Sequence, residues 1–436
     1  MNRHTRTRIS GSIGAAAAAL LVLGACGLGD PGDDVDQEAI EDAEITGEIT
    51  FQTMQLSPTF DDLINGYIED FEDEYPEVTV EWVDVPSEGT AQKLNADAAS
   101  DNLPDVLDLD IAHMVPLARE GRLLDIASVA PEAQDDYLDS AWETFDIGGE
   151  GIAALPWYLN TPVLVVNEQI TGEAGIDDHP QTWEDLLDVS AQIGDSTDQA
   201  GFQLNSSTFE DILLATGTPI VNEDGTEAVL NTPEAEDAVE RLHELYQDGG
   251  IPADSITAQD RSEIEAFQEG ELAYLPAGPN RLSIIEENAP DLVDDLTVTT
   301  PVTNAEGEAW IVSHGLAVPT TSENPATAVE FARFVSNPEN QLALSGESVV
   351  FPSTPEALDD PFFTESDGSL EDEGRVIAAQ NLIDENVEPE SEVLDQEIDE
   401  ELWSQMQLAL MGDEDISTAL ERAEEELNAI LQGRTG

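Results

Sequence analysis

The chain has 436 residues, of which 96 are acidic and 13 are basic, so its formal net charge at neutral pH is −83. Such a negative surface repels nucleic acids and anionic lipids, which excludes both as partners. Apolar residues form 40% of the chain, as in folded proteins, and the length predicts two or three domains that each bury a core.

The first 45 residues indicate export and anchoring. Three arginines precede an apolar run about half as long as the roughly 20 residues of a membrane-spanning helix, which predicts a signal peptide over residues 1–25. The run ends in Leu23-Gly24-Ala25-Cys26, which resembles the lipobox of bacterial lipoproteins, so Cys26 is the expected lipidation site; an ordinary signal peptide is the alternative. Cys26 is the only cysteine, which excludes intrachain disulfides and thiolate metal sites. Residues 26–45 are acidic and aperiodic, which predicts a disordered tether.

Regular elements begin near Gly47. A strand start at Ile49–Phe51 precedes a helix whose apolar residues recur at helical spacing from Phe60 to Phe71. The pattern then predicts a strand at 78–83, a helix at 90–99, a strand at 106–109 and a helix at 115–120. This alternation predicts a parallel sheet with helices on its faces, and therefore an α/β fold.

A second set of elements starts with a strand of buried type at 163–166. The expected elements after it are helices at 183–193 and 233–246, strands near 271–275 and 297–299, and helices at 325–335 and 416–431.

Several segments, in this order, resemble the family-1 solute-binding proteins of ABC importers, the family that includes maltose-binding protein. Leu103-Pro104-Asp105-Val106 is similar to the start of the family's third strand, and Pro180-Gln181-Thr182-Trp183-Glu184-Asp185-Leu186 is a typical block of the family. The other similar segments are 71–80, Gly121–Ile126, 154–167, 174–176, 317–319, 328–334 and 419–431.

The resemblance implies a periplasmic-binding-protein-like fold, in which two α/β lobes are joined by a three-crossing hinge and close on a ligand. Placing the crossings by the family pattern gives lobe one as 46–156 plus 279–313. Lobe two is then 157–278 plus 314–436.

Candidate ligand contacts lie in loops that follow strands, because open α/β sheets bind ligands outside the carboxyl ends of their strands. Polar groups there would pair with sugar hydroxyls, and aromatic rings would stack on the weakly apolar face of a sugar. The candidates in the first half of the chain are Gln55, Ser57, Asp110, His113, Trp157, Tyr158 and Asn160.

The candidates in the second half are Asn205, Ser206, Phe209, Asn280, Arg281, Ser313 and Trp403. Asn280 stands where the family often has a stacking aromatic. For three candidates a structural role is the alternative to ligand contact. Trp157 would pack the hinge, Trp403 would pack in a helix core, and Arg281 would pair with nearby acids. Trp82, Trp142 and Trp183 are interpreted as structural residues.

The expected function is a solute-binding protein with no catalytic residues, no metal site and no cofactor. The chain lacks G-x-S-x-G, H-E-x-x-H and P-loop motifs, and with 96 acids a chance carboxylate pair carries no information. A polyamine or another non-sugar solute is the first alternative. A secreted carbohydrate-active enzyme is the second.

The expected partners are a mono- to trisaccharide solute and the transmembrane subunits of an ABC permease. We expect a monomer on the extracellular face of the cell membrane, held there through its N-terminal lipid only. Because exposed acids repel one another unless salt screens them, we interpret the acidity as adaptation to a halophilic habitat, with cation binding as the alternative.

Overall fold

A computed structural model describes residue 40 and residues 43–434, except 87–88, 150, 223–224, 258–261, 390–393 and 395. Cys26, the predicted signal peptide and most of the predicted tether lie outside these residues. Within the described ranges, every helix is too short or too polar to cross a bilayer.

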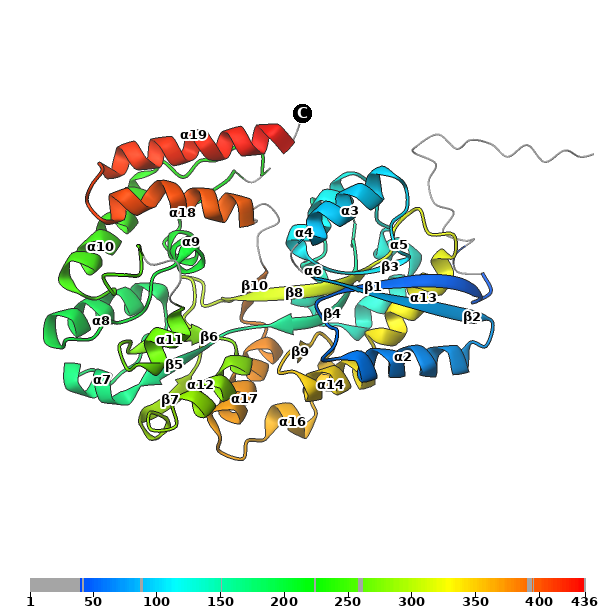
Figure 1. The fold of residues 1–436 in the computed structure, drawn as a ribbon, viewed down its shortest axis with the longest axis horizontal. Coiled ribbons are helices and arrows are strands. Elements are labelled where there is room, and N and C mark those ends of the chain that lie inside the picture. Colours follow the sequence, from blue (N-terminus) through cyan, green and yellow to red (C-terminus); the bar gives the residue numbers. More distant parts are fainter. Residues whose placement is uncertain are drawn as a thin grey trace, which may run out of the picture. The chain divides into compact units, whose positions relative to one another are not determined.

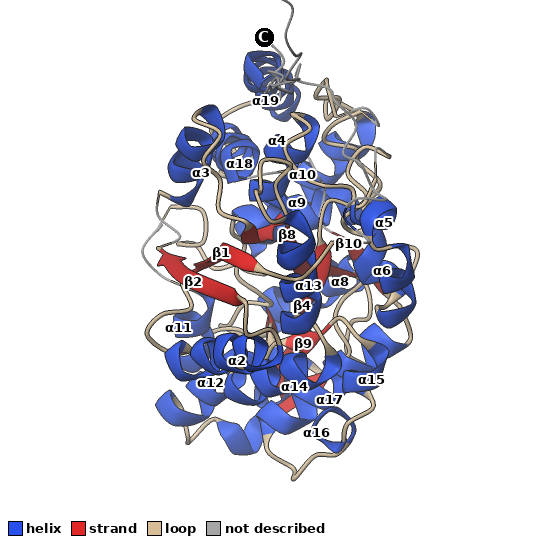
Figure 2. Ribbon diagram, turned by 90° about the vertical axis from the view of Figure 1, so that its right-hand side faces the viewer, coloured by secondary structure: helices blue, strands red, loops and turns tan. Residues whose placement is uncertain are grey.

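Three parallel strands and their connecting helices open the first sheet, as the sequence predicts. They are β1 (Gly47–Met54), α2 (Asp61–Glu74), β2 (Val78–Val85), α3 (Thr90–Ala99), β3 (Val106–Asp110) and α4 (Ile111–Arg119). β1 pairs in parallel with β2 along its whole length and with β3 near its middle. α2 lies on one face of this sheet, and α3 and α4 lie on the other (Figures 1 and 2).

One long strand, β8 (Ala309–Ala317), joins several parts of the first sheet. The other strands here are β4 (Leu155–Asn160), β9 (Phe351–Pro352) and β10 (Val387–Pro389). β8 runs antiparallel to both β3 and β4, while its first residues pair with β10. The described strands of this sheet follow the order β2-β1-β3-β8-β4-β9, with β10 beside β8.

A second, three-stranded sheet has β5 (Val163–Asn167) at its centre, between β6 (Tyr274–Ala277) and β7 (Leu296–Thr299). Both neighbours run antiparallel to β5. Only Thr161 and Pro162 separate β4 from β5, so the chain passes directly from the first sheet into the second. Residues 300–308 lead back from β7 into β8.

Further helices pack around both sheets (Figure 1). The α-helices are α5 (Ile126–Val129), α6 (Asp139–Glu143), α7 (Glu168–Ala174), α8 (Trp183–Ser196), α9 (Ser206–Ala215), α10 (Pro233–Asp248), α11 (Glu263–Gln268), α12 (Leu282–Asn288), α13 (Pro325–Val335), α14 (Pro338–Glu347), α15 (Pro355–Leu358), α16 (Pro361–Thr364), α17 (Leu370–Ile383), α18 (Gln396–Leu410) and α19 (Ile416–Arg434). The 3-10 helices are η1 (Pro131–Asp136), η2 (Pro279–Arg281) and η3 (Val293–Asp295).

Local sequence explains where the best-defined helices begin. Thr182 accepts a hydrogen bond from the backbone N–H of Asp185, and the Asp185 carboxylate accepts one from the backbone N–H of Thr182. This capping box satisfies two donors that would otherwise be unpaired at the start of α8. Trp183, the next residue, is buried in the core, which confirms its structural role.

The apolar side chains form separate core clusters. The first cluster takes residues from 40–158 and 316–344, and in it Phe51 and Phe71 each meet Phe331 edge to face, with ring centroids 5.3 and 5.1 Å apart. The second cluster takes residues from 164–302 and 398–431. A third lies between β5 and the helices α12 and α17.

These clusters divide the chain differently from the expected lobes between residues 279 and 344. Leu282 and Val298, expected in lobe one, pack in the third cluster beside Val165 of β5. Residues 316–344, expected in lobe two, pack in the first cluster. The reason is the pairing of β8 with β3 and β4, which brings the chain back to the first sheet only at β8.

Candidate functional site

Carboxylates gather where the parallel strands of the first sheet end. Asp84 of β2 accepts hydrogen bonds from the Thr53 hydroxyl (2.7 Å) and from the backbone N–H of Leu56 (2.9 Å). Asp108 of β3 accepts one from the backbone N–H of Met54 (3.3 Å). The loop after β1 is therefore held between carboxylates from the two neighbouring strands, at the edge where α/β sheets bind ligands.

An aromatic pair from β4 and β8 adjoins this edge. Tyr158 stacks on His314, with ring centroids 4.5 Å apart, and His314 Nδ1 lies 2.9 Å from the carboxylate of Asp108. Burial raises the pKa of the Tyr158 phenol well above its usual value, and the charges of Asp108 and Asp110 raise it further. The phenol is therefore neutral at physiological pH and can act as a hydrogen-bond donor.

A second histidine–carboxylate pair stands at the start of α4. Asp110 caps the helix by accepting a hydrogen bond from the backbone N–H of His113 (2.8 Å), and His113 Nδ1 lies 2.7 Å from the same carboxylate. Burial alone would raise the pKa of Asp110, but the hydrogen bonds and charge of His113 outweigh burial and lower it. The hydrogen bond to Asp110 raises the pKa of His113 against the opposing effect of burial.

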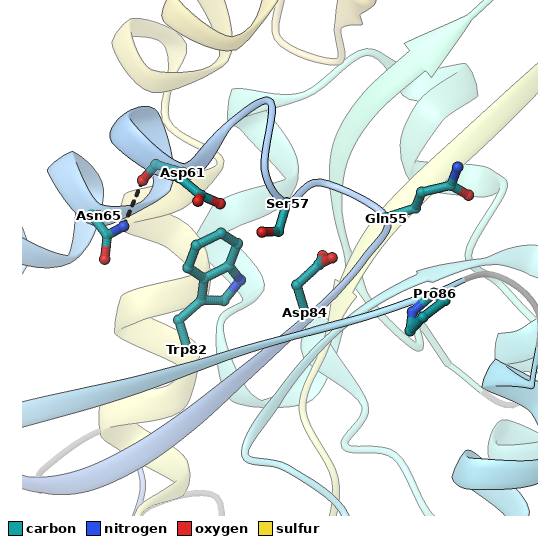
Figure 3. Close-up of a pocket in the computed structure, with 7 residues that line it drawn as sticks. All are labelled: Gln55, Ser57, Asp61, Asn65, Trp82, Asp84 and Pro86. Carbon is teal, nitrogen blue, oxygen red and sulfur yellow. Dashed lines mark hydrogen bonds between the residues drawn. The ribbon is translucent and has the colours of Figure 1, made fainter.

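A pocket of about 680 Å³ opens beside these strand ends (Figure 3). It lies between the end of β1, the end of β2 and the start of α2. Its described lining residues are Gln55, Ser57, Asp61, Asn65, Trp82, Asp84 and Pro86. Trp82 lines the pocket, and its Nε1–H donates to the Thr53 hydroxyl (2.8 Å).

A further group of candidates lies on α9 and α18. Asn205 caps α9, and Ser206 hydrogen-bonds the carboxyl of Asp399. Phe209 and Trp403 pack with ring centroids 5.8 Å apart. Burial raises the pKa of Asp399, the hydrogen bond from Ser206 opposes this effect, and the charge of Glu400 adds to it.

The structure brings together some of the predicted site residues. Gln55 and Ser57 line the pocket. Asp110, His113 and Tyr158 belong to the histidine, carboxylate and tyrosine side chains described above at the same edge of the first sheet. Asn160 ends β4 opposite Val312. Asn280 and Arg281 lie on η2, where Arg281 forms an ion pair with Glu263 at 2.6 Å, the structural alternative expected for it.

Besides Tyr158, three predicted contacts have buried side chains in this structure. Trp157, with no exposed surface, packs against Phe51 in the first core, which corrects its expected place at a ligand surface. Ser313 is likewise without exposed surface, and Phe209 is 1% exposed. The pairing of β4 with β8 shifts register between Pro156 and Tyr158, so Trp157 lies at this irregularity, whereas Tyr158 pairs with His314 and stacks on it.

Sequence reasoning missed several lining residues. Trp82 was expected in the core, and it does pack against the first cluster, but its half-buried ring also lines the pocket. Trp142, by contrast, is buried as expected. Asp84 follows the apolar residues of a predicted strand, so the rule that picked Gln55 and Asp110 could have found it. Among the described residues, no group of three or more histidine, cysteine or acidic side chains is arranged to hold a metal ion.

Comparison with known proteins places the chain in a family. The model of the bacterial extracellular solute-binding protein family matches residues 57–342, about two thirds of the chain. The chain therefore belongs to that family.

Two relatives and one solved structure illustrate the range of similarity. The diacetylchitobiose binding protein DasA of Streptomyces coelicolor is 25% identical over 346 residues, which cover 77% of this chain and 80% of that protein. The sn-glycerol-3-phosphate-binding periplasmic protein UgpB of Escherichia coli is 30% identical over 145 residues, 31% of this chain and 32% of that protein. The structure of a candidate oligosaccharide periplasmic-binding protein from Synechococcus sp. MITs9220 is 27% identical, covers 88% of this chain and 99% of its own, and superposes with a TM-score of 0.79.

This similarity and the arrangement of the sheets give the chain a periplasmic-binding-protein-like α/β fold. Its two α/β lobes are joined by a three-crossing hinge.

Proposed function

We propose that this protein is the solute-binding subunit of an ABC importer that captures a small carbohydrate between its two lobes and delivers it to a membrane permease. Membership of the solute-binding family supports the capture of a solute. The observation that carries the carbohydrate assignment is the combination of a tryptophan face with carboxylates and an amide around one pocket. Carbohydrates match this chemistry because they offer hydroxyl groups and a weakly apolar ring face.

In this proposal the two lobes supply complementary halves of the site. The lobe built on the first core cluster contributes Asp110, His113 and Tyr158, together with Gln55 and Ser57 of the pocket. The second lobe contributes Asn205, Ser206, Trp403 and Asn280 from loops and helices. Closure of the hinge would bring the halves onto one solute and replace its water contacts by protein hydrogen bonds.

The remaining parts of the proposal rest on the sequence. Lipidation at Cys26 would hold the protein on the extracellular face of the membrane, and residues 26–45 would act as a flexible tether. In this proposal the protein acts as a monomer, and its role is to bind the solute without converting it.

A thermal-shift series tests the proposal. The full chain without its signal peptide would be melted in about 1 M NaCl with diacetylchitobiose, maltose, sn-glycerol 3-phosphate or spermidine. A solute present at about 100 times its dissociation constant adds about 2.7 kcal/mol to the free energy of unfolding. We expect stabilisation by a neutral sugar, and X-ray scattering should show a more compact protein when that sugar is bound. Stabilisation by spermidine alone would favour the polyamine alternative, which the acidic strand ends also fit.

A further inference from the structure

We propose that the pocket beside β1, β2 and α2 is a subsite for one neutral sugar ring, which stacks on Trp82, and that its carboxylates exclude anionic solutes. This inference rests on the proposed function and names the class of solute that the first lobe accepts. The indole of Trp82 lies among Asn65, Asp61, Ser57 and Asp84 (Figure 3), so hydrogen-bonding side chains surround an aromatic face.

The Trp82 ring is held in place from behind. Its Nε1–H donates to the Thr53 hydroxyl at 2.8 Å, and that hydroxyl donates to Asp84 at 2.7 Å. The Trp82 side chain is also partly buried against the first core cluster. A ring fixed in this way loses little conformational freedom when a solute stacks on it, which favours binding.

Hydrogen-bonding capacity remains available around the ring. Asp61 Oδ1 is buried and has no hydrogen-bond partner among the described residues. A buried carboxylate oxygen without a partner costs free energy, which a solute hydroxyl donating to it would recover. Asn65, which donates to the backbone oxygen of Asp61 at 2.6 Å, is exposed at the pocket and retains its amide oxygen as an acceptor.

The charge of the lining distinguishes between classes of solute. Two lining residues, Asp61 and Asp84, are acidic, and no described lining residue is basic. Lys93, the sole lysine, donates hydrogen bonds from its ammonium group to Asp97 and Gln52. The arginines that form ion pairs with acids are Arg122, Arg241, Arg281, Arg333, Arg375 and Arg422. A phosphate or carboxylate in this pocket would meet negative charge without a counter-ion, so the structure favours an uncharged sugar.

The decisive experiment measures affinities by isothermal titration calorimetry in about 1 M NaCl, with the four solutes named above. The variants are Trp82→Ala and Trp82→Phe, with Trp142→Phe as a control because Trp142 is a buried tryptophan of the same lobe outside the pocket. We expect Trp82→Ala to weaken binding of the neutral sugar at least tenfold. Trp82→Phe, which keeps a ring, and Trp142→Phe should stay within about threefold of the wild type.

The possible results separate this inference from the proposed function. If the wild type and the Trp82→Ala variant bind a neutral sugar equally well, the subsite is overturned and the proposed function stands. Binding of sn-glycerol 3-phosphate as tight as that of the neutral sugar would overturn the exclusion of anions. If none of the four solutes binds the wild type, the proposed function fails and the subsite fails with it. If Trp82→Ala does not fold, Trp82→Leu, which fills much of the same space without an aromatic ring, should give the same loss of affinity, and an affinity equal to that of Trp82→Phe would overturn the subsite.

Discussion

The rings of Tyr158 and His314 stack with an interplanar angle of 15°, although 156 positions of sequence separate the two residues. The contact depends on the antiparallel pairing of β4 with β8, which places Tyr158 opposite His314. His314 continues the contact to β3 through Asp108. Side chains from three adjacent strands therefore form one unit at the edge of the first sheet.

Replacing His314 should destabilise the protein. His314→Ala would remove the hydrogen-bond partner of Asp108 Oδ1, while Oδ2 keeps the backbone N–H of Met54; the Asp108 side chain has no exposed surface. The variant would also lose the stacking partner of Tyr158. Leaving a buried polar group unsatisfied costs about 1–3 kcal/mol. Urea denaturation in molar salt would measure the loss. His179→Ala is the control, because its partner Glu168 is half exposed and the change should cost at most about 1 kcal/mol. Equal losses of stability in the two variants would contradict the stabilising role of His314 between Asp108 and Tyr158.

Trp157→Ala should lower the free energy of unfolding, since the Trp157 ring is fully buried. Removing a large aromatic side chain from a core costs about 3–5 kcal/mol of unfolding free energy. Trp403→Ala is the matched comparison, because Trp403 is only partly buried against the second cluster. Its loss of stability should be smaller, while its affinity for the solute should fall. A Trp157→Ala variant as stable as the wild type would refute the core role.

The Asp110–His113 pair predicts a specific pH dependence. The pKa of His113 is raised above its ordinary value of 6.5, so its stabilising effect is complete below about pH 6.5 and disappears as the pH rises through the raised value. The pKa of Asp110 is lowered from 3.8, so its contribution is present above about pH 3.8 and is lost as the pH falls through the lowered value. The difference in melting temperature between wild type and His113→Ala should therefore be largest between these limits. A difference that stays constant from about pH 5 to about pH 9 would argue against the pair.

Salt should stabilise the fold strongly. At a net charge of −83, the repulsion between surface acids is long-ranged near 0.1 M salt, where the screening length is about 10 Å. Near 1 M that length falls to about 3 Å, so the melting temperature should rise steeply between these concentrations. Scanning calorimetry across a NaCl series measures the effect. A melting temperature independent of salt would remove the halophilic interpretation of the acidity.

Much of the fold could be predicted from local patterns. The expected helices at 90–99 and 325–335 coincide with α3 and α13, because helical periodicity and flanking breakers depend only on neighbouring residues. β8 could not be placed in the same way, since its strand is defined by partners on β3, β4 and β10 that are distant in sequence. The difference between the core clusters and the expected lobes has the same origin.

The candidate site was predictable where it follows from strand ends. Asp110 and Gln55 directly follow residues with strand patterns, and the structure places both near the expected edge. Trp157 and Tyr158 show the limit of this rule. Regular alternation would send adjacent aromatics of a strand to opposite faces, but both rings belong to the first core cluster, where the pairing is irregular near Pro156.

The single lysine of the chain makes this protein unusually easy to label. Lys93 lies on α3 and contacts Gln52 of β1, two residues before that strand ends. Its ammonium is partly exposed, and its ion pair with Asp97 contributes little to stability. Once the α-amino group at the N-terminus is blocked, an amine-reactive fluorophore would therefore mark Lys93 alone, next to the strand whose end borders the pocket. The same conjugate could report solute capture optically, without an engineered cysteine.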